Sequence, residues 1–318
     1  MTTENIIENL DGIEGRFKNP VLTIGNFDGV HKGHIALFDK VKELAANING
    51  QSIIMTFEPH PIKIVKPGNG PPLITPIKQK LNLISKEGLD TIFCLPFTRE
   101  FASISAEAFV KDLLVGKIGI KELVVGYDYT FGSDRKGDIN LLRSMGEKLG
   151  FRVHMVDPIY LSGTLVSSTS IRNLIREGNL IEGKRLLGRD YHIAGTVAKG
   201  ADRGGKVLGF PTANIIPEDE LIPRQGVYAV SVELGDETHQ GVCNIGYNPT
   251  FGDNSLSIET HILDFSGDIV GEQINIIFIQ HMRDEKTFNG IQGLADQIAK
   301  DINQAKELFN LYGHSQNT

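Results

Sequence analysis

Hydrophobic residues in the first half of the chain follow two alternating spacings. Short apolar runs have the length of buried strands, and between them apolar residues recur at helical intervals. The expected strands are Val21–Ile24, Ser52–Phe57, Thr91–Leu95, Leu123–Val125 and Val153–Val156. The expected helices cover residues 34–46, 76–87, 105–116 and 138–149. This alternation predicts an α/β domain in which a parallel sheet carries helices on both faces.

The pattern changes after about residue 190, where expected strands follow one another without helices between them. These strands are His192–Lys199, Val227–Leu234, Gln240–Ile245, Ile258–Phe265 and Gln273–His281. Apolar residues in the second of them alternate with smaller or polar ones, which is typical of an antiparallel strand with one buried face. Two short helices within 167–188 precede the change, and helical spacing returns only at 289–310. We therefore expect two domains, residues 1–184 and 185–318, the second an antiparallel β-barrel or sandwich closed by a terminal helix.

The composition of the 318 residues limits the partners and the location of the protein. Its formal charge of −7 gives no broad basic surface for nucleic acid, so a polyanion must bind in a local pocket. No apolar stretch approaches the roughly 20 residues that cross a bilayer, and the N-terminus lacks the pattern of a secretory signal. The two cysteines give no disulfide framework. We expect a cytoplasmic monomer or homo-oligomer that binds neither nucleic acid nor membranes.

A glycine-rich turn joins the first expected strand to the first expected helix, with the sequence GNFDGVHKGH at residues 25–34. The start of a helix offers unpaired N–H groups and a positive dipole end, which suit a phosphate. His31 and His34 are three residues apart and would lie on one face of the first helical turn. A pair of histidines can also be half of a metal site, but neither Cys94 nor Cys243 lies at ligand spacing from them. The turn therefore predicts an anion site with two imidazoles beside it.

This turn resembles the His-x-Gly-His signature of nucleotidyltransferases, in the form found in bacterial bifunctional riboflavin kinase/FMN adenylyltransferases. A second motif, SSTSIR at 167–172, has hydroxyls that could simply cap a helix. It resembles the segment with which the same superfamily holds the triphosphate of ATP. The resemblance implies that His31 and His34 contact the α-phosphate. It implies that Arg172 is a further catalytic residue, which holds the β- and γ-phosphates of ATP. It also implies ATP contacts, chiefly to the phosphates, from Gly25, Asn26, Phe27, Ser168 and Thr169.

Two further segments, TFEPHP at 56–61 and GYDYTFG at 126–132, resemble the flavin-lining segments of the adenylyltransferase half of this family. An isoalloxazine ring needs an apolar, aromatic slot, but aromatic residues of this kind also occur in ordinary cores. The assignment of a flavin site therefore rests on the resemblance. It implies flavin contacts from Phe57, Pro59, His60, Asp128, Tyr129 and Phe131.

A glycine-rich stretch in the second half ends in GFPTAN at 209–214, which resembles the Pro-Thr-Ala-Asn motif of riboflavin kinases. By composition alone the stretch is typical of a surface loop, and it lacks the ending of a Walker A loop. The resemblance implies ATP contacts from Gly200, Lys206 and Gly209, and Mg²⁺ ligation by Thr212 and Asn214. It also implies that Glu259, in the later segment IETH, is the general base for the flavin hydroxyl.

The resemblance spans about residues 16–310 and implies a complete bifunctional enzyme. Its N-terminal domain would have a Rossmann-like nucleotidyltransferase fold and convert FMN and ATP into FAD. Its C-terminal barrel would phosphorylate riboflavin with ATP to give FMN, with Mg²⁺ as the metal cofactor. One alternative is a flavin- or nucleotide-binding regulator that keeps the fold without turnover. A second is a chain in which only one half is active.

Overall fold

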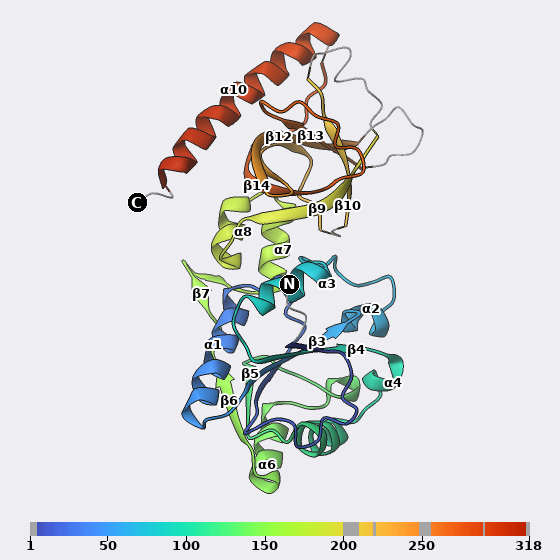
Figure 1. The fold of residues 1–318 in the computed structure, drawn as a ribbon, viewed down its shortest axis with the longest axis vertical. Coiled ribbons are helices and arrows are strands. Elements are labelled where there is room, and N and C mark those ends of the chain that lie inside the picture. Colours follow the sequence, from blue (N-terminus) through green and yellow to red (C-terminus); the bar gives the residue numbers. More distant parts are fainter. Residues whose placement is uncertain (1–4, 200–209, 219–220, 248–255, 289, 316–318) are drawn as a thin grey trace. The chain divides into compact units, whose positions relative to one another are not determined.

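The computed structural model describes residues 5–199, 210–218, 221–247, 256–288 and 290–315 (Figure 1). The chain divides into two compact units, Met1–Ser168 and Thr169–Thr318, and each is described by itself. The expected domain boundary after residue 184 stays a prediction. Among the residues described, no helix is both long enough and apolar enough to cross a membrane.

The first unit is built on a six-stranded sheet in which all neighbouring strands are parallel. The strands are β1 (Ile6–Ile7), β2 (Val21–Ile24), β3 (Ser52–Glu58), β4 (Thr91–Pro96), β5 (Glu122–Gly126) and β6 (Arg152–Val156). Their order is β1-β4-β3-β2-β5-β6, so the chain moves outward from β2 in one direction and then in the other. The reversal lies between β2 and β5, and this is where an open α/β sheet forms a ligand crevice.

Helical segments connect these strands and cover both faces of the sheet. They are α1 (Lys32–Asn47), α2 (Pro61–Val65), α3 (Ile77–Ser85), α4 (Arg99–Ala102), α5 (Ala106–Ala108), the π-helix η2 (Phe109–Ile118), the 3-10 turn η3 (Ser133–Arg135) and α6 (Ile139–Leu149). A short hairpin of β7 (Tyr160–Leu161) and β8 (Thr164–Leu165) follows, and helix α7 (Ser168–Arg176) begins at the end of the unit. The predicted α/β architecture is confirmed.

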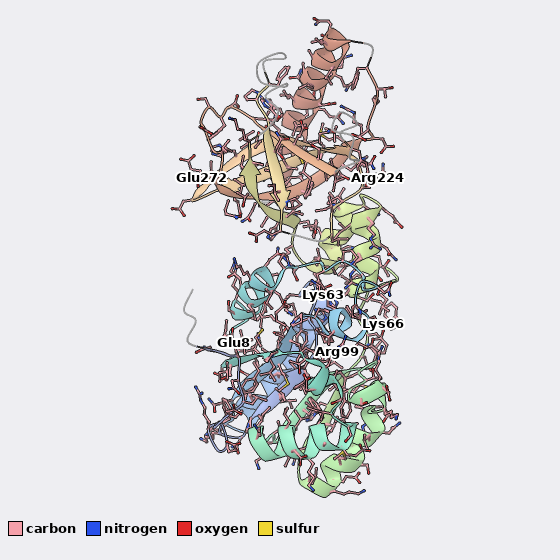
Figure 2. The ribbon with its side chains drawn as sticks, turned by 90° about the vertical axis from the view of Figure 1, so that its right-hand side faces the viewer. Glu8, Lys63, Lys66, Arg99, Arg224 and Glu272 are labelled. Atoms are coloured by element: carbon pink, nitrogen blue, oxygen red, sulfur yellow. The ribbon has the colours of Figure 1, made fainter. Side chains whose placement is uncertain are left out.

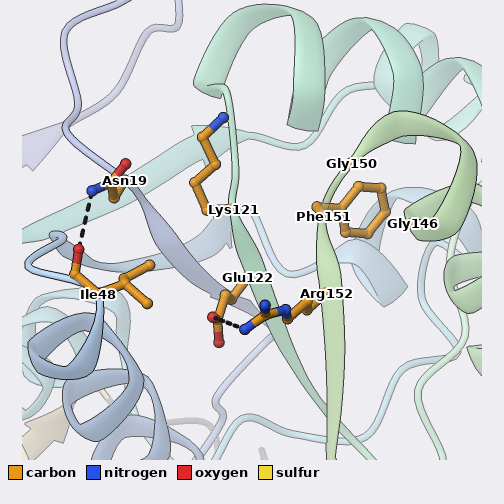
Figure 3. Close-up of a pocket in the computed structure, with 8 residues that line it drawn as sticks. All are labelled: Asn19, Ile48, Lys121, Glu122, Gly146, Gly150, Phe151 and Arg152. Atoms are coloured by element: carbon orange, nitrogen blue, oxygen red, sulfur yellow. Dashed lines mark hydrogen bonds and ion pairs between the residues drawn. The ribbon is translucent and has the colours of Figure 1, made fainter.

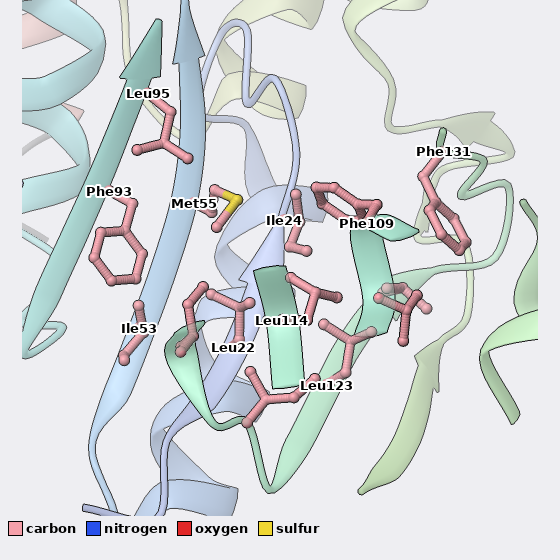
Figure 4. Packing of buried hydrophobic residues seen from close by; sticks show 14 of the residues in the cluster. Leu22, Ile24, Ile53, Met55, Phe93, Leu95, Phe109, Leu114, Leu123 and Phe131 are labelled. Atoms are coloured by element: carbon pink, nitrogen blue, oxygen red, sulfur yellow. The ribbon is translucent and has the colours of Figure 1, made fainter. Parts of the chain in front are cut away.

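Alternation along the buried strands divides the core of this unit into two clusters. In β2, Leu22 and Ile24 belong to the cluster under η2 and α6, whereas Val21 belongs to the cluster under α1 and α3. Successive strand residues point to opposite faces, so a strand that is apolar throughout requires helices on both sides. Figure 4 shows part of the first cluster, with Phe109 and Leu114 of η2 packed close to the strands.

The second unit begins with two short helices and continues as a closed antiparallel barrel. The elements are α7, α8 (Leu180–Leu187), β9 (Tyr191–Ala198), β10 (Ala213–Pro217), β11 (Gly226–Leu234), β12 (Glu237–Tyr247), β13 (Leu256–Ile262), β14 (Gln273–Arg283) and α10 (Ile291–Ser315). The strand order around the barrel is β10-β13-β12-β11-β14-β9. Helix α10 packs Ala305 and Phe309 against Val227 of β11 and Val242 of β12. Of the two predicted alternatives, the barrel is confirmed.

Several elements differ from the sequence expectations. The helix expected at 105–116 is a short α-helix that continues as the π-helix η2 to Ile118. Strand β10 was not expected, because its first residues belong to the end of the glycine-rich motif. Helix α2 was also missed, since Pro61 stands at its first position and the helix has only five residues.

Candidate active sites

The β2–α1 loop lies at the carboxyl end of β2, beside the reversal of strand order. It carries residues 25–31 and leads directly into α1 at Lys32. Strand β2 pairs with β3 on one side and β5 on the other, so the loop occupies the centre of the sheet edge. This is the position at which doubly wound sheets bind nucleotides. The sequence-based location of the anion site is therefore consistent with the topology.

His31 and His34 form a reciprocal cap at the start of α1. The backbone N–H of His34 donates to Nδ1 of His31, and the backbone N–H of His31 donates to Nδ1 of His34, each at 3.3 Å. Their rings stack with centroids 3.5 Å apart and planes inclined by 17°. In a neutral imidazole whose Nδ1 accepts, the proton is on Nε2. Both Nε2 atoms are therefore hydrogen-bond donors.

The glycine between these histidines is required by close packing. A Cβ atom on Gly33 would lie 3.1 Å from both Cε1 and Nδ1 of His31 and 3.4 Å from the carbonyl oxygen of Val166. The His31 ring is itself buried, at 5% exposure. Gly33 thus lets the imidazole lie flat against the first turn of α1.

Strained backbone and buried tethers fix the shape of the loop. Phe27 and Val30 have positive φ angles of 49° and 40°, which non-glycine residues rarely adopt. The buried carboxylate of Asp28 accepts hydrogen bonds from the backbone N–H groups of Ile74 and Thr75, at 2.9 and 3.2 Å. These contacts come from the segment before α3 and hold the loop in a conformation that the local sequence alone would not favour.

The three loop residues expected to contact ATP have structural partners in the first unit. The backbone N–H of Gly25 donates to the carbonyl of Met55, which joins the loop to β3. The carbonyl of Asn26 accepts from Oγ1 of Thr56 at 3.2 Å. Phe27 is buried, and its ring makes a T-shaped contact with the His34 ring, with centroids 5.2 Å apart. Phe27 therefore packs against the histidine pair through the His34 ring. That Gly25, Asn26 and Phe27 contact ATP stays a prediction.

The hydroxyl motif lies at the start of α7, as expected. Ser168 is the first residue of this helix, and its Oγ donates to the carbonyl of Asp28 at 2.9 Å. This bond brings the second nucleotidyltransferase motif to the β2–α1 loop. Thr169 is exposed, whereas Arg172 is buried at 8% exposure on the same helix. Thr169 and Arg172 belong to the second compact unit, and their roles stay predictions.

The aromatic residues expected to contact flavin also contribute to the core. Phe57 and Phe131 are each 7% exposed and belong to the cluster under η2. Tyr129 packs against that cluster and stacks on Phe131, with ring centroids 5.6 Å apart and an inclination of 16°. Burial raises the pKa of the Tyr129 hydroxyl. Tyr129 and Phe131 form a stacked aromatic pair beyond the end of β5, and Phe57 lies near the end of β3. Aromatic side chains at the ends of these strands are compatible with a flavin site.

The other residues expected at the flavin site lie beyond the ends of the same two strands. His60 is buried, and its Nδ1 caps α2 by accepting from the backbone N–H of Ile62 at 3.1 Å. Pro59 comes immediately before it, and Asp128 is exposed in the turn after β5. Three exposed cations lie on or near α2: Lys63 is in the helix, Lys66 is at its C-cap, and Arg99 begins α4, which contacts α2 (Figure 2).

The second unit brings together two of the residues expected at the kinase site. Asn214 of β10 lies directly opposite Glu259 of β13 in the barrel register, and Asn244 of β12 lies opposite Glu259 on its other side. Directly opposite residues place their side chains on the same face of a sheet. Ile258 and Thr260 are buried, so Glu259 lies on the other face, where Oγ of Ser257 donates to its carboxylate at 2.9 Å.

The expected Mg²⁺ ligands supply oxygen donors, which a hard cation prefers. Thr212 immediately precedes β10, and both Thr212 and Asn214 are half-buried. The donor set of a hydroxyl and an amide oxygen beside a carboxylate fits Mg²⁺ that is also held by ATP phosphates. Within the described part of the chain, no cluster of three or more His, Cys, Asp and Glu side chains could hold a metal ion. Gly200, Lys206 and Gly209 lie outside the described residues.

Two hollows in the surface do not coincide with the histidine site. One, of about 480 Å³, lies at the amino ends of β5 and β6, opposite the β2–α1 loop (Figure 3). There the buried Glu122 pairs with Nε2 of His154 at 2.8 Å and with Arg152 at 3.6 Å. The other hollow, in the barrel unit, is lined by Arg224, Gln225, Asp284 and Glu285. We place the candidate nucleotidyltransferase site at the carboxyl edge because parallel sheets bind ligands there.

Comparison with known proteins agrees with both halves of this description. A sequence model of the FAD synthetase family matches residues 14–170, and one of the riboflavin kinase family matches residues 187–309. The bifunctional riboflavin kinase/FMN adenylyltransferase of Escherichia coli K12 is 38% identical over 292 residues, covering 92% of this chain and 93% of that protein. The relative of the same name from Listeria monocytogenes is 40% identical over 294 residues, with the same coverage.

The chain belongs to the family of bifunctional riboflavin kinase/FMN adenylyltransferases.

A solved structure has the same fold across this bifunctional chain. It is named as a macrolide-efflux protein from Streptococcus pneumoniae, and it is 31% identical with a TM-score of 0.84. The match covers 95% of this chain and 98% of that one. Macrolide efflux is a different activity from those of the curated relatives. A shared fold does not by itself transfer an activity, so the family rests on the matched families and the named relatives.

Two residues that shape the adenylyltransferase site of this family member were not predicted from the sequence. Asp28 lies inside the recognised turn, but its partners Ile74 and Thr75 are far along the chain. Lys80 lies on α3 and is 4% exposed. Neither set of contacts is encoded in a local motif. One signal for Lys80 was available, since it shares a helical stripe with the buried Ile84.

Proposed function

We propose that this chain converts riboflavin to FMN in its second catalytic unit and FMN to FAD in its first, using ATP in both reactions. The catalytic units are residues 1–184 and 185–318. The observation that carries the proposal is the reciprocal cap of His31 and His34 at the sheet's switch point, which makes both Nε2 atoms donors. Family membership supports both activities.

In the adenylyltransferase reaction, a phosphate oxygen of FMN attacks the α-phosphorus of ATP. The bond from that phosphorus to the bridging oxygen of the β-phosphate breaks, and pyrophosphate leaves. His31 and His34 donate from Nε2 to the α-phosphate oxygens as negative charge grows there. Ser168, Thr169 and Arg172 hold the β- and γ-phosphates. Stacking and capping hold the two rings in one arrangement, so their donors are already oriented when the charge develops.

Flavin and nucleotide bind at the same edge of the sheet in this proposal. Gly25, Asn26 and Phe27 border the nucleotide. The isoalloxazine ring lies beyond the carboxyl ends of β3 and β5, and Phe57, Pro59, His60, Asp128, Tyr129 and Phe131 contribute contacts. The exposed cations Lys63, Lys66 and Arg99 add positive charge on and near α2, which favours an anionic substrate.

In the kinase reaction, the 5′-hydroxyl of riboflavin attacks the γ-phosphorus of ATP and ADP leaves. Glu259 accepts the proton of that hydroxyl, so no strong base is needed from solvent. Its position opposite Asn214 supports this role, because the base then lies beside the residues that hold the nucleotide's metal. Gly200, Lys206 and Gly209 are proposed to contact ATP in this unit.

Mg²⁺ is the metal of this proposal, with Thr212 and Asn214 as its protein ligands in the kinase unit. When bound, Mg²⁺ neutralises phosphate charge and favours transfer of the phosphoryl group. We also propose a cytoplasmic location, which agrees with the two buried free thiols of Cys94 and Cys243.

Isotope tracing tests the proposed reactions. The chain is incubated with riboflavin, Mg²⁺ and ATP labelled at either the α- or the γ-phosphorus, and flavins are separated by chromatography over time. The γ-label should enter FMN first and then FAD, whereas the α-label should enter FAD alone. With FMN supplied instead of riboflavin, the γ-label should leave as pyrophosphate. Absence of both labelled flavins would refute the enzyme proposal.

The same experiment distinguishes the remaining alternatives. A regulator without turnover would bind flavin or nucleotide and give no labelled product. A chain with one active half would give labelled FMN without FAD, or FAD only from supplied FMN. No feature of the described residues favours either alternative.

A further inference from the structure

Lys80 is a lysine whose side chain is buried inside the first unit. It is 4% exposed, although lysine is among the residues least often buried, and it lies on α3 with its side chain directed into the protein. A buried ammonium group requires hydrogen-bond acceptors or a counter-charge. The acceptors and charges around its ammonium group therefore indicate the role of Lys80.

The ammonium group of Lys80 bridges the ends of two parallel strands. Nζ donates to the carbonyl of Asn26 at 3.2 Å and to the carbonyl of Phe57 at 3.2 Å. Asn26 lies in the β2–α1 loop, and Phe57 lies near the end of β3, within the segment 56–61 that is expected to contact flavin. Helix α3 thus ties the nucleotide loop and the flavin segment to one side chain.

The charge of Lys80 lies near titratable groups of three neighbouring segments. Burial lowers the pKa of Lys80, while electrostatic interactions with Cys94 on β4 in its ionised form, with Glu58 at the end of β3 and with Asp28 in the loop raise it. The carboxylates of Glu58 and Asp28 are thus the counter-charges near the ammonium group. Charge-assisted hydrogen bonds are stronger than neutral ones. An ammonium group therefore holds the two carbonyls more firmly than a neutral donor would.

The loop needs such an anchor because its backbone is strained. Phe27 and Val30, on either side of the tethered Asp28, have positive φ angles. Asp28 fixes the loop from the segment before α3, and Lys80 fixes it from α3 itself. His31 follows Val30 directly in the chain. A shift of the backbone at Asn26 is therefore passed to the imidazoles through only a short stretch of chain.

We propose that Lys80 is a positioning residue for adenylyl transfer. It holds the β2–α1 loop and the end of β3 in a fixed position relative to each other, through the carbonyls of Asn26 and Phe57. It acts through the loop and does not itself touch the reacting phosphates. This inference rests on the proposed FMN adenylyltransferase activity of the first unit. It adds a residue outside all the motifs recognised in the sequence.

The test compares Lys80→Met with Lys78→Met. Methionine keeps the bulk of the buried side chain and removes its donors, and Lys78 is an exposed lysine on the same helix. FAD formation from supplied FMN should fall in kcat on the order of 10²-fold in Lys80→Met, because small misplacements of reacting groups are this costly. The KM values for FMN and ATP should change by less than about threefold, since the loss is in the transition state. Kinase activity in the same preparation should match Lys78→Met.

A double-variant comparison separates positioning from general weakening of the fold. His31→Asn keeps a side chain that can cap α1 and removes the proposed donor. If Lys80 acts through the β2–α1 loop and His31, Lys80→Met should slow FAD formation far less in the His31→Asn background than in the wild-type background. Equal fold-losses in both backgrounds would overturn the proposal. So would FAD formation by Lys80→Met within about twofold of Lys78→Met.

A second variant decides the case in which Lys80→Met fails to fold, as judged by its thermal unfolding. Thr56→Val removes the other donor to the Asn26 carbonyl and keeps the shape of the side chain. It should lower kcat for FAD formation by about three- to tenfold, the loss of one hydrogen bond, and again less in the His31→Asn background. An unchanged kcat in Thr56→Val would then overturn the proposal. Wild-type FAD formation is measured alongside, so failure of the proposed function itself is distinguishable.

Discussion

His31 at the N-cap of α1 and His34 in its first turn each combine a structural and a chemical role in one ring. Nδ1 accepts a backbone N–H and caps α1, which fixes the tautomer, and the proton on Nε2 then makes that atom a donor. Replacement by alanine would remove both roles, and loss of an N-cap alone costs about 0.5–2 kcal/mol. Asparagine is the better substitution, because it can keep the cap while removing the donor.

At the kinase site, the change Glu259→Gln isolates the proton acceptor. Glutamine keeps the size of the side chain but cannot take a proton from the flavin hydroxyl, so kcat for FMN formation should fall by roughly 10²–10⁴-fold. The KM for Mg-ATP should change little. The matched control is Glu272→Gln, an exposed glutamate of the same unit (Figure 2). Equal activity of the two variants would show that Glu259 is not the base.

The buried thiol of Cys243 predicts a pH effect on stability. Burial raises its pKa from 9.0 to about 12 in the folded state. The stability it contributes is complete below pH 9, and it is lost as the pH rises toward 12 because only the unfolded thiol ionises, at roughly 1.4 kcal/mol per pH unit. Urea unfolding of wild type and Cys243→Ala at pH 8 and pH 10 checks this. The variant should lose less stability over this interval, and an equal loss would contradict the assignment.

At the scale of elements, Asp28 connects the nucleotide loop to the segment before α3. Asp28→Asn keeps one acceptor oxygen but turns an amide N–H₂ group toward backbone donors, which should cost about 1–3 kcal/mol of unfolding free energy. FAD formation should fall more than kinase activity, because the tether lies in the first unit. Asp39→Asn, an exposed residue on α1, is the control. If FAD formation by Asp28→Asn equals that of the control, the tether does not shape the site.

Elements with a clear apolar period were predictable from sequence, and elements set by distant contacts were not. Strand β2 and the core of α1 follow directly from local spacing. Strand β10 has only five residues, and its pairing with β9 and β13 is what defines it. The π-helical form of η2 is also invisible to a period analysis, because the same apolar residues fit an ordinary helix.

Residues of the candidate sites also fall into two groups, those within a local motif and those placed by distant contacts. Residues within a local motif, such as His31 and His34, could be named from the sequence because they stand together in a short segment that resembles a known signature. Lys80 and the partners of Asp28 could not, since their contacts join segments about 50 residues apart in sequence. The pairing of Asn214 with Glu259 needed the barrel register.

At the scale of the whole molecule, two separate cores support two chemistries. The parallel sheet has its own clusters on both faces, and the barrel packs against α10 through a third. Because each unit has its own core, a substitution at one site should leave the chemistry of the other intact.

The formal charge of −7 does not attract the anionic phosphates of ATP and FMN. Their attraction must come from local donors and cations in each unit.

The most direct test of this account is a chromatographic time course of His31→Asn and Glu259→Gln, each supplied with Mg-ATP and either riboflavin or FMN. His31→Asn should convert riboflavin to FMN at the wild-type rate and accumulate it without FAD. Glu259→Gln should leave riboflavin unchanged but convert supplied FMN to FAD at the wild-type rate. Loss of FMN formation in the first variant, or of FAD formation from FMN in the second, would contradict two separate active sites.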